Sequence, residues 1–144
     1  MQSDTQLVVS VTILCTLISA FVAWFVADKT LKKQDRINDL KDIVKLTYRL
    51  ITSAEAYWLS AGRDIKAEHQ LKHKTKRLIV EIEQIFSGDK KRFKVLEQKG
   101  KEFRMKITGG QFESKNRTEE LGRVSNINEM GMELIDLIKN PKKQ

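Results

Sequence analysis

The sequence has little of what most enzymes and secreted domains depend on. Its single cysteine, Cys15, excludes an intramolecular disulfide framework. One proline and seven glycines leave too few turn residues for an all-β fold. Residues 7–27 contain no charged side chain at all. The sequence therefore indicates a helical chain with a distinct apolar segment near its N-terminus.

Signals for catalysis and for metal binding are also scarce. The only two histidines, His69 and His73, are four residues apart, a spacing at which two imidazoles on one helical face can ligate zinc. The lysines and the arginine around them would repel a dication, so we expect no metal site. Gly109-Gly110 is followed by no P-loop Lys-Ser/Thr, and we interpret it as a turn between helices. We expect no catalytic residue and no bound cofactor.

The apolar run from Leu7 to Ala27 is long enough to cross a membrane. Its 21 residues span about 30 Å as a helix, which matches the hydrocarbon core of a bilayer. A cleavable signal peptide is the alternative, but it requires a positively charged start, whereas residues 1–6 read MQSDTQ. We predict an uncleaved transmembrane helix at residues 7–27, preceded by a short extracytoplasmic N-terminus at residues 1–6.

The charge distribution predicts an orientation for this helix. All 27 basic residues follow residue 27, and 18 of the 19 acids do so too. Six of the basic residues closely follow the apolar run: Lys29, Lys32, Lys33, Arg36, Lys41 and Lys45. The positive-inside rule then predicts an inner (plasma) membrane protein with its N-terminus outside. Residues 28–140 would form a cytoplasmic domain, followed by a basic tail at 141–144.

Small side chains recur every four residues within the apolar run, at Cys15, Ser19, Ala23 and Ala27. Such a stripe allows another helix to approach closely, so these residues are candidates for transmembrane packing with a second copy or a membrane partner. Ordinary transmembrane composition is the alternative interpretation.

Apolar residues after the run recur at alternating spacings of three and four. The first stretch, from Ile37 to Ala61, predicts a core-facing helix ended by Gly62. Further helices are predicted at residues 64–87, 89–107 and 116–140, with Asp89 as an N-cap and Glu119 in a capping box for the last. The predicted fold is all-α: one N-terminal transmembrane helix followed by a cytoplasmic antiparallel bundle of about four helices.

The antiparallel topology brings separate segments to the same ends of the bundle. At the membrane-proximal end, we expect lipid-headgroup contacts from Lys29, Lys32, Lys33, Lys90, Lys91 and Arg92, with Lys142 and Lys143 nearby. A solvated basic face is the alternative. At the far end, the candidate partner surface comprises Arg63, Asp64, Phe112, Glu113 and Arg117. There Phe112 either folds back onto the bundle or is offered to a partner.

These features favour a non-enzymatic function through protein contacts, as a scaffold, a sensor, or a regulatory or accessory subunit of a membrane system. One alternative is a pore-forming or membrane-perturbing protein that oligomerises through the small-residue stripe. A second is a membrane-tethered nucleic-acid binder that uses residues 66–77, where Glu68 is the only acid. No aromatic residue interleaves that stretch, so nucleic acid is the less favoured partner. The abundance of Lys and Ile is typical of bacterial or phage proteins.

Overall fold

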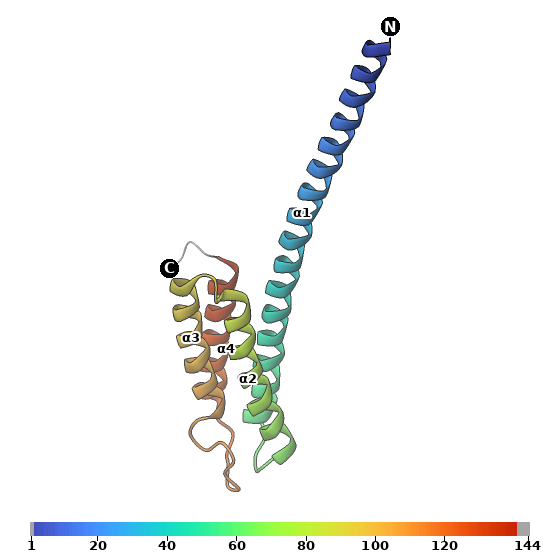
Figure 1. Cartoon of the computed structure of the whole chain (residues 1–144). Helices are drawn as coiled ribbons and strands as arrows, with labels where there is room; N and C mark the ends of the chain where they lie inside the picture. Colours follow the sequence, from blue (N-terminus) through green and yellow to red (C-terminus); the bar gives the residue numbers. More distant parts are fainter. Residues whose placement is uncertain (1, 141–144) are drawn as a thin grey trace. The chain divides into compact units, whose positions relative to one another are not determined.

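The computed structural model describes residues 2–140, with side chains from residue 14 onward, and within these residues the chain is helical without strands. The tail at 141–144, with Lys142 and Lys143, lies outside the described residues. The elements, shown in Figure 1, are α1 (Gln2–Trp58), α2 (Ile65–Phe86), α3 (Lys90–Thr108) and α4 (Leu121–Lys139). The predicted all-α fold, a long apolar N-terminal helix followed by a helical bundle, is confirmed.

The chain forms two compact units, residues 1–38 and residues 39–144. Helix α1 belongs to both, because it continues from the apolar segment into the bundle without a break. The uncharged part of the sequence ends just before Asp28, whereas burial of α1 side chains in the bundle begins further along the helix. From residue 14 onward, where side chains are described, Ile43 is the first fully buried side chain of α1, and the residues between Lys29 and Asp39 are all exposed.

The bundle part of α1 buries one face with the predicted three-four spacing. Its buried side chains are Ile43, Thr47, Leu50, Ile51, Ala54, Tyr57 and Trp58. The stripe is shorter than predicted, since Ile37 is exposed and Ala61 lies beyond the end of the helix at Trp58. The chain then turns through Gly62, whose φ of 81° suits a residue without a Cβ.

Helices α2 and α3 begin at aspartates that accept a hydrogen bond from their own first turn. The Asp64 carboxylate accepts from the Ala67 amide at 3.0 Å, and the Asp89 carboxylate accepts from the Arg92 amide at 3.1 Å. Each bond satisfies one of the amides that a helix start leaves unpaired. The prediction of Asp89 as an N-cap is thereby confirmed.

Two glycines mark close helix approaches in the core. A Cβ on Gly100 of α3 would lie 3.5 Å from Ile82 Cδ1 of α2, which is ordinary contact. A Cβ on Gly131 of α4 would lie only 2.5 Å from Ile51 Cδ1 of α1. The absence of a side chain at Gly131 therefore allows α4 to pack directly on α1. The turn at residues 59–64 and the loop at 109–120 share one end of the bundle, opposite the α2–α3 turn (Figure 1).

The predicted start of α4 is wrong. The helix begins at Leu121 instead of near Asn116, and no capping box forms at Glu119. Residues 117–120 instead bind the segment that follows α1: the Gly62 amide donates to Arg117 O at 2.9 Å, and the Glu120 amide donates to Trp58 O at 3.1 Å. These long-range hydrogen bonds hold the segment out of a helical path.

Candidate functional site at the tip of the bundle

We use "the tip" for the end of the bundle formed by the turn at residues 59–64, the loop at 109–120 and the adjoining helix ends. Arg117 is its central side chain and is only 2% exposed. Its guanidinium donates to the carbonyl oxygens of Tyr57 and Gly62 and to Ser60 Oγ, the last at 3.1 Å. It also lies 3.5 Å from the centroid of the Tyr57 ring. Because α1 has no basic residue in its last turn, Arg117 supplies the cation that caps it.

A second set of buried polar side chains, Tyr57 and Glu68, lies beside Arg117. The Tyr57 hydroxyl donates to Glu68 Oε1 at 3.0 Å and accepts from the Glu113 amide at 3.2 Å. The other carboxylate oxygen of Glu68 accepts from Arg63 Nε at 3.2 Å. Burial raises the pKa of the Tyr57 phenol, so it remains protonated and continues to donate to the carboxylate. These bonds fix the end of α1 to the start of α2.

Aromatic side chains also pack against one another at the tip. Phe112 is half-buried, with ring centroids 5.1 Å from Tyr57 and 6.3 Å from Trp58. Trp58 is fully buried, donates from Nε1 to Ile107 O at 3.0 Å, and has the Arg123 guanidinium 4.4 Å from its ring centroid. Of the two alternatives for Phe112, the structure shows the one in which it folds back onto the bundle.

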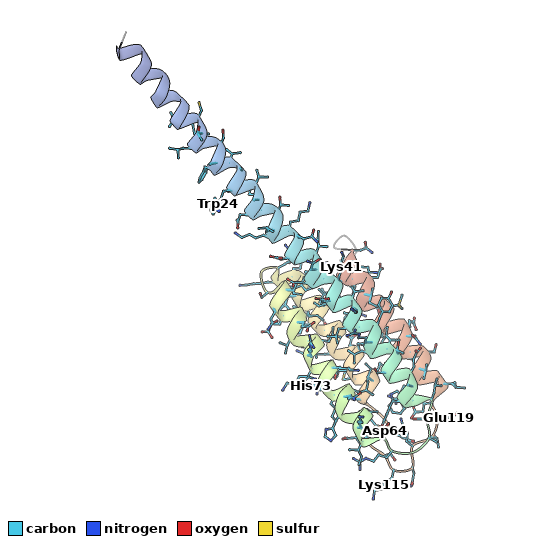
Figure 2. All side chains as sticks on the ribbon, turned by 90° about the vertical axis from the view of Figure 1, so that its right-hand side faces the viewer. Trp24, Lys41, Asp64, His73, Lys115 and Glu119 are labelled. Carbon is cyan, nitrogen blue, oxygen red and sulfur yellow. The ribbon has the colours of Figure 1, made fainter. Side chains whose placement is uncertain are left out.

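The structure brings all five predicted partner residues to the tip but gives them different environments. Arg117 and Phe112 point inward, whereas Arg63, Asp64 and Glu113 remain at the surface. Glu113 pairs with Lys72 Nζ at 2.7 Å, and this hydrogen bond lowers the pKa of the Glu113 carboxyl. Asp64 and Lys115 are labelled at this end of the molecule in Figure 2.

Three exposed aliphatic side chains at the tip were missed by the sequence reasoning. Leu59 is 44% exposed, Ile65 is 56% exposed and Leu121 is 71% exposed. Ile65 and Leu121 fit the three-four apolar spacing of their helices, which favours a place in the core. Each is in fact the first residue of its helix, beyond the reach of the opposing helices. The signal for their exposure was that each directly follows the N-cap of its helix.

The residues predicted to contact lipid headgroups also differ in their exposure. Lys29, Lys32, Lys33, Lys90 and Lys91 are exposed. Arg92 is only 9% exposed, because its Nη2 donates to Ile138 O at 2.7 Å and its guanidinium lies 4.6 Å from the Phe86 ring centroid. It therefore binds the C-terminal end of α4, as Arg117 binds that of α1. Lys32 pairs with Asp28 at 2.7 Å, which leaves Lys29 and Lys33 as the less compensated cations of that group.

Within the described residues, α1 contains the one segment long and apolar enough to span a membrane. Its most apolar window has a mean hydropathy of 1.5, and none of that window is buried. A helix in the core of a soluble domain would instead be covered by its neighbours. The side chains of Cys15, Ser19, Ala23 and Ala27 are all exposed. The Ser19 hydroxyl donates to Cys15 O at 2.8 Å, which satisfies it inside its own helix.

Metal binding and catalysis have little support among the described residues. In the part of the chain that is described, no three His, Cys, Asp or Glu side chains gather where a metal ion could bind. An open cavity of about 410 Å³ between α1 and α4 is lined by Tyr48, Met132, Glu133, Ile135, Asp136 and Lys139, with no serine, cysteine or histidine among them. Comparisons of the chain with protein-family models, with curated proteins and with solved structures found no match.

Proposed function

We propose that this protein is a single-pass, membrane-anchored adaptor that works through protein contacts made by the tip of its bundle. It would serve as a scaffold, a sensor or an accessory subunit of a membrane system. The observation that carries the proposal is the exposure of Leu59, Ile65 and Leu121 around a tip whose buried polar groups are bonded to one another.

The construction of the tip suits recognition of another protein. Interfaces draw most of their affinity from a few well-packed anchor residues, and rigid anchors lose less entropy on binding. Here Arg117 and Tyr57 fix the backbone that carries Leu59, and the Glu120–Trp58 bond holds Leu121 beside the end of α1. The exposed Lys72–Glu113 pair supplies a polar edge of the kind that borders protein interfaces.

Tip contacts are tested by photo-crosslinking from single positions in the native membrane. A photoreactive residue replaces Leu121 in the full-length protein, and matched variants carry it at Tyr48 on α1 or Met132 on α4, which are also exposed. We expect one defined crosslinked product from position 121 only. Leu59→Ser should abolish it while leaving the helical content unchanged.

Two results would contradict a partner at the tip. The first is equal crosslinking from all three positions, which would indicate non-specific collision. The second is a ladder made only of the protein itself, enriched when the photoreactive residue is at Ala23. That ladder would favour self-assembly through the membrane segment.

The proposal includes the orientation with the N-terminus outside and the bundle in the cytoplasm of an inner (plasma) membrane. It is supported by the exposed Lys29, Lys33, Lys41 and Lys45 that follow the apolar run. A Cys15→Ser chain with cysteine at Lys115 should react with a membrane-impermeant maleimide only after the cells are opened. A cysteine at Gln2 should react in intact cells. The reverse pattern would overturn the orientation.

A further inference from the structure

The outer face of α2 carries a straight row of side chains. Lys66, His69, His73, Lys76 and Val80 are all exposed and follow one another at spacings of three, four, three and four. At 100° per residue these five positions lie within an arc of about 80° and extend over about 21 Å. We call this row the α2 ridge. His73 is labelled on it in Figure 2.

The α2 ridge is more basic in the fold than in the sequence. Glu68, the single acid among residues 66–77, is 2% exposed and is bonded to Tyr57 and Arg63. Neighbouring cations are compensated, since Lys72 pairs with Glu113 and Arg77 pairs with Glu81. For Lys66 and Lys76, no ion pair with a carboxylate is found within the described residues. Lys74 also pairs with no carboxylate in the described residues, but it is partly buried and donates to Ser53 Oγ at 3.3 Å, so the exposed unpaired lysines of α2 are those of the ridge.

The spacing and the charge of the ridge favour some kinds of partner over others. Alternating steps of three and four residues keep side chains in line with a second helix lying alongside, as in a coiled-coil seam. A second copy of the same ridge would place like charges opposite each other and be repelled. Nucleic acid would find no exposed Phe, Tyr or Trp on α2 for base stacking, because the one phenylalanine of that helix, Phe86, is buried.

We propose that the α2 ridge docks an acidic helix of a partner protein, with carboxylates at the same three-four spacing opposite Lys66 and Lys76. Val80 gives the partner helix one apolar contact at the end of the row. The inference rests on the proposal that this protein acts through protein contacts. It uses side chains other than Leu59, Ile65 and Leu121, although Ile65 directly precedes the ridge, so separate variants test the two surfaces.

The test uses full-length protein in phosphatidylcholine nanodiscs, which carry no net lipid charge, and two synthetic peptides. One peptide is an alanine-based helix with glutamates at three-four spacing, and the other has the same composition with its glutamates distributed around the helix. We expect the first to bind at least about tenfold more tightly by fluorescence anisotropy, because only its carboxylates reach the ridge together. Equal binding of both peptides, or binding of neither, would overturn the proposal.

Matched variants separate docking on the ridge from general attraction to a basic protein. Lys66→Glu with Lys76→Glu should weaken binding of the three-four peptide by about tenfold or more. Lys90→Glu with Lys91→Glu, the same charge change at exposed positions of α3, should leave it within about twofold. Equal losses, or a single-stranded oligonucleotide of equal charge that binds as tightly, would contradict the ridge as a protein-docking face. Leu59→Ser should abolish crosslinking from position 121 but leave peptide binding unchanged.

Discussion

The Arg117→Ala variant is expected to lose about 3 kcal/mol of bundle stability, seen as a fall of roughly 15 °C in the thermal midpoint. The substitution removes hydrogen bonds to the carbonyls of Tyr57 and Gly62 and to Ser60 Oγ. It also removes the guanidinium that stacks on the Tyr57 ring. The Gly62 carbonyl would then lose its charged donor, while the Tyr57 carbonyl would keep only donors from Ser60, among them the hydroxyl at 2.9 Å. A buried acceptor left without a donor costs more than the bond itself contributes.

Circular dichroism of the full-length protein in detergent measures this change. Arg117→Lys should recover only a small part of the loss, since an ammonium cannot donate in three directions from a planar fork. Lys115→Ala is the matched control: it removes a cation two residues away that is exposed, and it should alter stability by less than about 0.5 kcal/mol. A lysine variant as stable as the native chain would show that only the charge of Arg117 matters.

The second large effect is expected from Gly131→Val, with a loss of about 3 kcal/mol. A Cβ at this position would lie 2.5 Å from Ile51 Cδ1, 2.6 Å from Ile51 Cγ1 and 3.2 Å from Phe103 Cε2. Both neighbours are buried, so neither side chain has free space into which to move. Overpacking of this kind forces helices apart or side chains off their rotamers. Thermal unfolding of the variant measures the cost.

Alanine substitutions at two glycines of α4 provide the comparison. Gly122→Ala should be neutral or stabilising by about 0.5 kcal/mol. A Cβ added at Gly122 would have nothing within 4 Å, and alanine favours a helix. Gly131→Ala should instead cost about 1 kcal/mol, as the clash exceeds that gain. In an Ile51→Ala background the same Gly131→Ala change should be stabilising, since its methyl group fills the space left by Ile51. Equal effects at the two glycines would show that α1 and α4 are not in close contact.

The parts of the fold that could be predicted from the sequence are those encoded locally. The spacing of Leu50, Ala54 and Trp58 defines the buried face of α1, and Asp89 signals a helix start within three residues of itself. The absence of glycine and proline between the apolar run and residue 58 is consistent with the single helix observed. Each of these signals requires only neighbours along one helix.

The parts that could not be predicted depend on residues far apart in the chain. Arg92 and Arg117 resemble surface cations in the sequence, yet each caps the C-terminal end of a helix 45 to 60 residues away. The helix start expected near Asn116 failed for the same reason, because residues 117–120 bind the end of α1. Similarly, no local pattern showed that Glu68 turns inward and leaves residues 66–77 of α2 without an exposed acid.

The capping of α1 by Arg117 has a consequence for the order of events during synthesis. Arg117 follows Tyr57 by 60 residues, so a ribosome adding about 5–20 residues per second delivers it about 3–12 s later. Until then the end of α1 lacks its cap, and until α4 is made Gly131 is not present to meet Ile51. The N-terminal apolar segment is complete well before either event. On the proposed membrane anchoring, insertion would precede closure of the bundle, and the bundle would fold while already tethered.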